Sequence, residues 1–420
     1  MRDEIRERIE AVRRGEVPDG YTKTQIGILP KEWAVYPLSE ISDVIADQAG
    51  EAELETMSIS AGIGFVNQAQ KFGKELSGKQ YSKYTVLRRG DFAYNKGNSK
   101  RYPQGCTYML RERDKAAVPN VFECFRIKEG VPEYYEQLFI HGFMNEQLAA
   151  KINHGVRDDG LLNLTDEDFY STQLPFPTTH EQRRIAEILD VCDRGLKLKQ
   201  KLIIEKQKQK QWLASQILRG GHRRLLCGIC PFICDGDWIE SKDQSDAGIR
   251  LIQTGNVGLG KFRDKENRAK FITEETFDRL HCTEVLAGDV LVSRLPDPIG
   301  RACIVPAMGV KAITAVDCTI LRFNDDNLAR YFVHYTTSRE YLDKVEALSG
   351  GSTRSRISRK EIEKLTIPIP DSIEQIIEIN NRLTVADKEI ELLEKEVEAQ
   401  YRLKKALMQL LLTGLVRVNA

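Results

Sequence analysis

A loop in the first half of the chain combines basic, amide and aromatic side chains in a pattern suited to a polyanion. It reads Tyr94-Asn95-Lys96-Gly97-Asn98-Ser99-Lys100-Arg101-Tyr102 and follows directly on the Gly90-Asp91 turn. Cations can bind phosphate, side-chain amides can bond base edges, and rings can pack on sugar or base. We therefore predict DNA contacts from Asn95, Lys96, Asn98, Lys100, Arg101 and Tyr102. For any single one of these residues, the alternative is a solvated side chain that binds nothing.

A second such loop lies at the matching place of the second half. After Gly288-Asp289 comes Ser293-Arg294-Leu295-Pro296-Asp297-Pro298-Ile299-Gly300-Arg301, in which two prolines stiffen the backbone. Arginine forks can bind guanine through two hydrogen bonds, and short polar side chains nearby add reach. A basic segment, Thr353-Arg354-Ser355-Arg356, would add phosphate contacts. The DNA-contact prediction in this half is Gln253, Thr254, Asn256, Arg294, Arg301, Arg354 and Arg356.

Motifs for catalysis are absent. The sequence has no phosphate-binding Gly-x-x-x-x-Gly-Lys-Ser/Thr loop, no Gly-x-Ser-x-Gly elbow and no His-Glu-x-x-His pair. It also lacks an Asn/Asp-Pro-Pro-aromatic motif, and Gly255–Gly260 has the wrong spacing for a dinucleotide loop. We predict no catalytic residues and no cofactor, which leaves a nuclease or stand-alone modification enzyme as a weak alternative.

The chain contains an internal duplication. Leu174-Pro175-Phe176-Pro177 precedes Glu181-Gln182 and a helical stretch that closes at Gly220, and Ile367-Pro368-Ile369-Pro370 precedes Glu374-Gln375 and a stretch that closes at Gly414. The offset is 193 for the Pro and Glu-Gln pairs and 194 for the closing glycines. A constant offset over this span predicts two copies of one module. Between these anchors the halves differ widely, which predicts a shared scaffold with different loops for specificity.

The repeat also bears on a possible zinc site. His222, Cys227, Cys230 and Cys234 could supply four ligands, and Cys-x-x-Cys is a common half-site. The first copy has Ser39 and Ser42 where the second has Cys227 and Cys230. We therefore favour small residues that pack a short turn, and predict no metal.

Two long helices should follow the modules, and their apolar spacing predicts that they pair. In the second helix, apolar residues recur in alternating steps of four and three, the pattern of a coiled-coil seam, whereas lysines interrupt the same pattern in the middle of the first helix. Residues 180–224 hold 12 Lys/Arg against 5 Asp/Glu, whereas residues 371–405 hold 9 Asp/Glu against 6 Lys/Arg, so their flanks are complementary. We predict an intramolecular antiparallel pair; the alternatives are independent surface helices, or a homodimer through one helix. Partner-binding residues on the helices are predicted to be Ile185, Leu189, Leu196, Ile203, Ile390, Leu393 and Val397.

Composition sets the class of protein. With 420 residues, 41% hydrophobic and 30% charged, the chain is large enough for several domains. Formal net charge is zero, so charge distribution matters more than the total. No apolar window approaches a membrane span, the first residues do not form a signal peptide, and nine mostly isolated cysteines suit a reducing cytoplasm.

These patterns predict an α+β fold with two mixed α/β domains separated by two long antiparallel coiled-coil helices in a pseudo-twofold repeat. Strands are expected at 84–87, 122–127, 290–292 and 302–305, and short helices at 133–147 and 328–347. The expected segments are an N-terminal helix and lead-in (1–24), a first recognition domain (25–178), a central long helix (179–222), a second recognition domain (223–370) and a C-terminal long helix (371–420).

The whole chain resembles the DNA-specificity subunits of type I restriction–modification systems. The resemblance rests on Gln25-Ile26-Gly27-Ile28-Leu29-Pro30-Lys31-Glu32-Trp33, on the two Pro-x-Pro…Glu-Gln…helix…Gly blocks, and on the two variable modules. It implies a non-catalytic subunit that reads a bipartite, asymmetric site on double-stranded DNA with two target-recognition domains. It also implies that the helices dock two adenine-N6 methyltransferase subunits, which bind S-adenosylmethionine, and that restriction/translocase subunits join the complex. Helix length would then set the spacer between the half-sites.

Two alternatives share this architecture. A structural adaptor with two protein-binding modules on a coiled-coil spacer would show no salt-dependent DNA affinity and no sequence preference. A specificity subunit that serves modification only, without a nuclease, has no distinguishing sequence feature.

Overall fold

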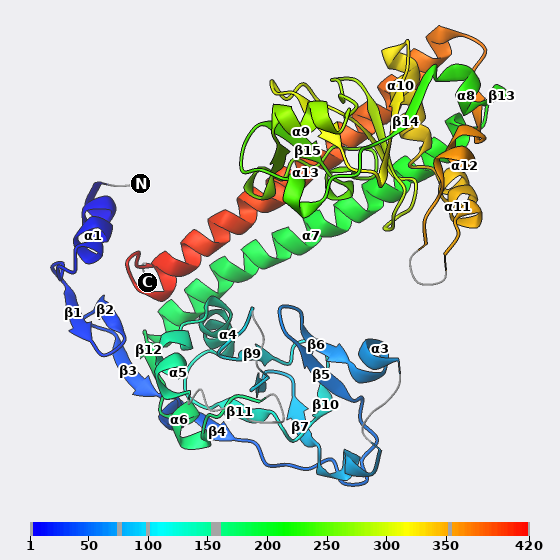
Figure 1. Ribbon diagram of the computed structural model, residues 1–420. Coiled ribbons are helices and arrows are strands. Elements are labelled where there is room, and N and C mark those ends of the chain that lie inside the picture. Colours follow the sequence, from blue (N-terminus) through cyan, green and yellow to red (C-terminus); the bar gives the residue numbers. More distant parts are fainter. Residues whose placement is uncertain (1–2, 74–77, 98–100, 153–160, 352–354, 419–420) are drawn as a thin grey trace. The chain divides into compact units, whose positions relative to one another are not determined.

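The computed structural model describes residues 3–73, 78–97, 101–152, 161–351 and 355–418 (Figure 1). Both helices and sheets are present, which confirms the α+β fold class. Contacts divide the chain into two compact units: Met1–Leu198 with Val397–Ala420 (unit 1), and Lys199–Glu396 (unit 2). Each unit combines one mixed module with a part of both long helices.

Unit 1 contains one four-stranded antiparallel sheet with the order β4-β11-β8-β9, and the two-stranded pairs β1-β2, β3-β12, β5-β6 and β7-β10. In chain order the elements are α1 (Asp3–Arg13), β1 (Tyr21–Thr24), β2 (Gly27–Pro30), β3 (Ala34–Pro37), α2 (Leu38–Ile41), β4 (Ser42–Val44), β5 (Met57–Ser60), β6 (Gly64–Asn67), α3 (Gln68–Phe72), the 3-10 helix η1 (Gly78–Lys83), β7 (Thr85–Arg88), β8 (Phe92–Asn95), β9 (Cys106–Met109), β10 (Lys115–Val118), β11 (Glu123–Ile127), α4 (Pro132–His141), α5 (Asn145–Lys151), α6 (Asp166–Tyr170), β12 (Gln173–Phe176) and α7 (Thr179–Ile217), which continues into unit 2.

Unit 2 has a four-stranded sheet with the order β14-β20-β17-β18, a three-stranded sheet β16-β15-β19 and the pair β13-β21. Its elements are β13 (His222–Leu225), α8 (Leu226–Ile229), β14 (Phe232–Asp235), η2 (Ser241–Asp243), β15 (Ile249–Ile252), η3 (Thr254–Asn256), η4 (Glu266–Arg268), β16 (Lys270–Ile272), α9 (Glu274–Arg279), β17 (Val290–Ser293), β18 (Ala302–Ile304), β19 (Ala312–Thr314), β20 (Cys318–Arg322), α10 (Asp326–Tyr335), α11 (Arg339–Leu348), α12 (Arg359–Glu363), β21 (Thr366–Ile369) and α13 (Ile373–Leu412), which continues into unit 1.

The duplication read from the sequence recurs in the topology of the two units. The order β4-β11-β8-β9 corresponds to β14-β20-β17-β18, and each set is followed by two helices, a short helix and a strand that pairs with β3 or β13. The Gly-Asp turn before β8 and β17 is also the same. Asp91 and Asp289 are buried, and each carboxylate accepts hydrogen bonds from an arginine of the neighbouring strand, Arg126 and Arg322. A buried carboxylate needs such donors, so this pair anchors the strand start in both copies.

Helices cover the sheets through aromatic packing. In unit 1, Phe92 stacks on Phe125 at a centroid distance of 5.3 Å, and Phe139 of α4 packs edge-on against both rings. Each helical region expected as one helix is two helices. Gly142, at a φ of 80°, ends α4, and Ser338 caps the start of α11 by accepting from the Tyr341 amide. A glycine in the left-handed region and a serine N-cap are strong helix boundaries, which outweighed the continuous apolar spacing.

The two long helices pair within each unit, and the predicted antiparallel pairing is confirmed. In unit 1, Lys404 of α13 binds Asp193 of α7 at 2.6 Å, and in unit 2, Lys199 binds Glu396 and Lys206 binds Glu389, each at 2.6 Å. Residue numbers rise along one helix as they fall along the other, which defines the antiparallel direction. In unit 2, basic α7 side chains meet acidic α13 side chains, whereas the pair in unit 1 has the opposite polarity; such charge pairs flank the seam of a coiled coil.

Candidate nucleic-acid interface

Lys96, in the first candidate loop, is held by two carboxylates. Its Nζ lies 2.8 Å from Glu123 Oε1 and 2.8 Å from Asp166 Oδ1, and its side chain is 13% exposed. Burial alone would lower the pKa of Lys96, but the hydrogen bonds that its ammonium donates to Asp166 and Glu123 outweigh this effect and raise that pKa. Asn95 also bonds locally, because its Oδ1 accepts from the Gly97 amide at 2.8 Å. These two side chains therefore shape the loop in the conformation seen.

Arg101 and Tyr102 lie in a more open place. The Arg101 guanidinium is exposed and lies 5.6 Å from the centre of the Tyr102 ring. Both side chains lie beside Gly62 at the tip of the β5-β6 hairpin, and the Gly62 amide donates to the Tyr108 hydroxyl at 2.8 Å. An exposed cation next to aromatic rings can bind phosphate and pack on sugar or base. Asn98 and Lys100 lie outside the described residues.

Arg301, in the second candidate loop, is a buried clamp. Its guanidinium donates to four backbone carbonyls: Val257 at 2.7 Å, Leu295 at 2.7 Å, Pro298 at 3.0 Å and Thr254 at 2.9 Å. It is 6% exposed, and burial lowers the pKa of this guanidinium. The clamp joins the turn at 253–256 to the loop at 294–301, so the structure brings these two predicted segments together. A base contact by Arg301 would require this set of hydrogen bonds to break.

Arg294 is buried in a second cluster of charges. It contacts Asp235 Oδ2 at 2.8 Å and donates to the Val316 carbonyl at 2.9 Å, while its Nε has no hydrogen-bond partner among the described residues. Burial is the main cause that lowers the pKa of Arg294. Arg356 is exposed and binds Asp317 at 3.0 Å. Arg354 lies outside the described residues.

The polar side chains of the 253–256 turn also bond within the turn. Asn256 accepts from the Gln253 amide at 3.0 Å and donates to the Arg263 carbonyl at 2.9 Å, which joins this turn to the segment at 261–268. Lys265 Nζ lies over Gly255, because a Cβ added there would meet it at 2.8 Å. The exposed cations nearest this turn are thus on a segment that the sequence interpretation missed.

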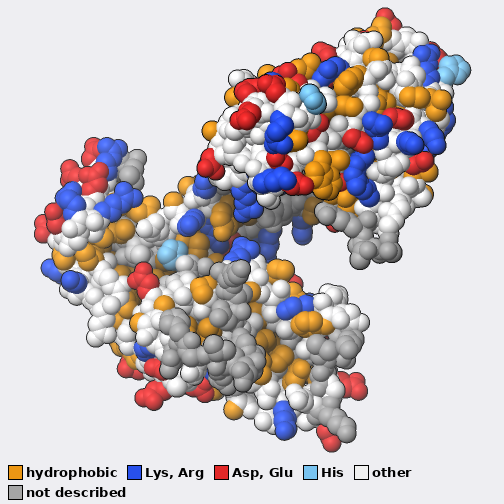
Figure 2. Space-filling model, in the orientation of Figure 1, with side chains coloured by type: hydrophobic (Ala, Val, Ile, Leu, Met, Phe, Trp, Pro, Cys, Tyr) orange, Lys and Arg blue, Asp and Glu red, His pale blue; other side chains and the backbone are white. Residues whose placement is uncertain are grey.

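A compositional signal for that segment was present. Residues 261–270 contain Lys261, Arg263, Lys265, Arg268 and Lys270, all of them exposed. Figure 2 shows Lys and Arg side chains interspersed with Asp and Glu over the visible face of unit 2. On this face of unit 2 the cations therefore occur in local groups among carboxylates.

The predicted partner-binding residues of the helices face the interior of each unit. Ile185 and Leu189 are fully buried and Leu196 is 8% exposed, whereas Ile203, Ile390, Leu393 and Val397 are half-buried along the helix pair. Other apolar residues of the helices are exposed, among them Val191 at 58%, Leu198 at 67% and Leu202 at 44% on α7, and Leu392 at 61% and Leu403 at 57% on α13. The first three are spaced by seven and four residues, so they form one stripe on α7.

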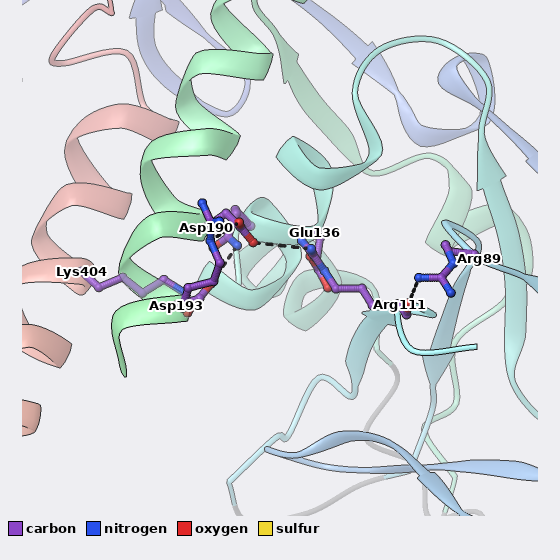
Figure 3. Close-up of polar contacts among 8 residues, drawn as sticks. Arg89, Arg111, Glu136, Asp190, Asp193 and Lys404 are labelled. Atoms are coloured by element: carbon purple, nitrogen blue, oxygen red, sulfur yellow. Dashed lines mark hydrogen bonds and ion pairs between the residues drawn. The ribbon is translucent and has the colours of Figure 1, made fainter. Parts of the chain in front are cut away.

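A chain of ion pairs and hydrogen bonds joins the helix pair to the mixed α/β module within unit 1 (Figure 3). Asp193 binds Lys404 and also accepts from Gln137 of α4 at 3.1 Å. One turn away, Arg111 bridges Glu136 of α4 and Asp190 of α7. The Arg111 carbonyl in turn accepts from Arg89 at 2.7 Å. The module is therefore fixed on the helices by directional contacts as well as by apolar packing.

Neither a metal site nor a membrane span is found in the part of the chain that the structure describes. Of the four zinc-ligand candidates, His222 is exposed near Asp371, and burial raises the pKa of the Cys230 thiol to about 11. The Cys230 thiol donates to the Phe232 and Arg322 carbonyls. These contacts fit the expected role in packing a turn.

Comparison with known proteins agrees with this architecture. Residues 230–400 match the family model described as the type I restriction modification DNA specificity domain. A Methanocaldococcus jannaschii protein named as the MjaX specificity subunit of a type I restriction enzyme is 24% identical over 432 residues, covering 96% of this chain and 97% of the relative.

Two solved structures share the fold. One, described in work on complex assembly and conformational transition of the type I R-M system, has a TM-score of 0.58 at 16% identity and covers 92% of this chain and 99% of that chain. The type I restriction–modification S subunit from M. genitalium has a TM-score of 0.52 at 12% identity and covers 90% and 96% of the two chains. In its duplicated sheets, its long helix pair and these matches, the chain is similar to the DNA-specificity subunits of type I restriction–modification systems.

Proposed function

We propose that the chain reads a bipartite, asymmetric DNA site, with one half-site recognised by each unit. One observation carries this proposal: the same sheet order and the same Asp–Arg anchor recur in both units, while the loops they hold differ in sequence and contacts. A duplicated scaffold with unlike loops suits two unlike half-sites, since loops on a rigid scaffold commonly hold specificity.

Within each unit the proposal divides the polar residues into two roles. The exposed Arg101 and the half-buried Tyr102 beside it in unit 1, and the exposed Arg263, Lys265 and Arg268 in unit 2, contact DNA. The buried groups Arg294 and Arg301 instead hold the loops in shape, because their donors are engaged inside the protein. Loss of an exposed cation should then weaken binding, while loss of a buried one should disorder the loop.

The helices are proposed to dock methyltransferase subunits. In unit 2, exposed Leu202 on α7 and exposed Leu392 on α13 offer apolar side chains for such a contact. We propose these residues as docking contacts in place of the seam residues, which already pack inside the chain. A restriction/translocase subunit would join the same complex, and the lengths of α7 and α13 would set the spacer between the half-sites.

Methylome sequencing tests the proposal. The chain is expressed with its cognate adenine methyltransferase in a strain without other modification, and N6-methyladenine is mapped. We expect a split motif with one methylated adenine in each half, and no modification when the chain is deleted. Modification that persists unchanged without the chain would instead favour a two-module protein-interaction adaptor.

A further inference from the structure

A pocket of about 310 Å³ opens in unit 2 between the end of α7 and the start of α13. Ile217, Ile379 and Pro370 give it apolar walls, and Gln375, Glu378 and Asp371 line it with hydrogen-bond acceptors. The internal repeat shows what fills the equivalent place in unit 1.

Strand register defines the equivalence. Ala34 of β3 pairs with Phe176 of β12, and His222 of β13 pairs with Ile369 of β21. Phe176 and Ile369 differ by the repeat offset, so Ala34 corresponds to His222. The residue before each strand is therefore also equivalent: Trp33 in unit 1 and Gly221 in unit 2.

In unit 1 the place is filled by the chain itself. Trp33 is 4% exposed, and its Nε1 donates to Glu181 Oε2 at 2.9 Å. Arg417 donates to both oxygens of the same carboxylate, at 2.7 and 2.9 Å. A Cβ added to Gly414 would meet Pro30 Cγ at 2.5 Å and the Trp33 ring at 3.1 Å, so no space is left.

In unit 2 the corresponding space is open. Gly220 corresponds to Gly414, yet a Cβ added to Gly220 would meet nothing within 4 Å. Gln182 has no exposed surface in unit 1, whereas its counterpart Gln375 is exposed. The nearby Arg223 binds Glu340 and is not among the residues that line the pocket. Arg382 lines the pocket but is paired with Glu378.

We propose that this pocket binds a tryptophan side chain, carried next to a basic residue by a segment of a partner protein. The indole would pack between Ile217 and Ile379 and donate its N–H to Gln375, Glu378 or Asp371, as Trp33 donates to Glu181. The basic residue would take the place of Arg417 against these acidic groups. The inference rests on the proposed function only in that the partner is a protein subunit.

The probe is a labelled peptide of residues 27–36 of this chain. It carries Trp33 with Lys31 two residues before it, and the same segment fills the equivalent place in unit 1. Binding to the full chain is measured by fluorescence anisotropy. A matched peptide with Trp33→Ala tests the indole. Gly220→Leu fills the pocket, and Gly228→Leu is the control variant, since that glycine also has nothing within 4 Å of an added Cβ and lies away from the pocket.

We expect the peptide to bind saturably to the wild type and to Gly228→Leu. Binding of the peptide to Gly220→Leu, and binding of the Trp33→Ala peptide to the wild type, should be weaker by a factor of roughly ten or more. Equal thermal melting of the two glycine variants establishes that both are folded. The inference is overturned if the wild type does not bind the peptide, or if Gly220→Leu binds it equally well. DNA binding by the same proteins is measured separately, so failure of the recognition proposal would show there and not in the peptide assay.

Discussion

Removal of the cation at Lys404 should destabilise unit 1 much more than removal of a surface cation. The Lys404 ammonium lies 2.6 Å from Asp193 Oδ1, and the two side chains are 8% and 32% exposed. Asp193 Oδ2 also accepts a hydrogen bond from Gln137 at 3.1 Å. Lys404→Met keeps the length and helix propensity of the side chain but leaves the Asp193 carboxylate with one neutral donor.

The expected cost follows from this geometry. Breaking a fully buried ion pair costs about 3–5 kcal/mol, because one charge remains unpaired. Asp193 keeps the Gln137 hydrogen bond, and its side chain is 32% exposed to water, which reduces the penalty. We therefore expect Lys404→Met to lower the free energy of unfolding by about 2 kcal/mol. In the double variant Lys404→Met with Asp193→Leu, no charge remains unpaired, and unfolding free energy should return to within about 1 kcal/mol of wild type.

Guanidinium unfolding followed by Trp33 fluorescence measures this in unit 1. Trp33 is 4% exposed, whereas Trp212 and Trp238 are 66% and 69% exposed, so both of the latter are changed to phenylalanine in the background. Arg184→Met is the matched control, because its pair with Glu187 is exposed on the same helix pair and should contribute no more than about 0.5 kcal/mol. The reasoning is refuted if Lys404→Met costs no more than Arg184→Met, or if the double variant is as unstable as the single one.

Three further predictions test the other sites. Arg301→Ala should leave its carbonyl partners unsatisfied, lower the melting temperature by an amount equivalent to about 3 kcal/mol and weaken binding to all DNA sequences alike. Arg263→Ala should leave the melting temperature unchanged and weaken DNA binding. The opposite pattern in melting and gel-shift assays would mean that the structural and the DNA-contacting roles are exchanged. Burial lowers the pKa of His334 to about 4, below its value in the unfolded chain, so the unfolded state binds a proton at a higher pH than the folded state. The folding free energy of unit 2 should therefore weaken by up to about 3 kcal/mol as pH falls from about 6.5 to about 4. Thermal melts of His334→Gln should lack this part of the pH dependence. Leu392→Asp should prevent co-purification with the methyltransferase, whereas Glu391→Gln on the adjacent exposed position should not; equal association of both variants would exclude this docking face.

Several elements of the fold were predictable because they depend on local sequence or on its periodicity. The repeat offset located both Pro-x-Pro strands and both long helices, and the four-three apolar spacing indicated their pairing. Strands at 85–88, 123–127, 290–293 and 302–304 lie where β-rich runs indicated them. The break between α4 and α5 was also readable in principle, since Gly142 and a downstream asparagine mark a helix end.

The roles of individual polar residues were not predictable in the same way. Lys96, Arg294 and Arg301 stand in loops whose composition matches that of Arg101, yet the first three bond inside the protein and Arg101 is exposed. Their partners Asp166, Asp235 and Thr254 lie tens of residues away in sequence. Which donor finds which acceptor depends on how those distant segments pack.

The sequence by itself determined that this chain carries two copies of one scaffold, each with a long amphipathic helix, because repeats and periodicity are properties of residue order. Only the tertiary structure decided in which of the two units the space at the end of the long helix is filled by side chains and in which it is open. Trp33 closes the helix end in unit 1, while Gly220 leaves the same place open in unit 2. The physical reason is that burial depends on every segment packed around a residue, including those that the repeat does not share.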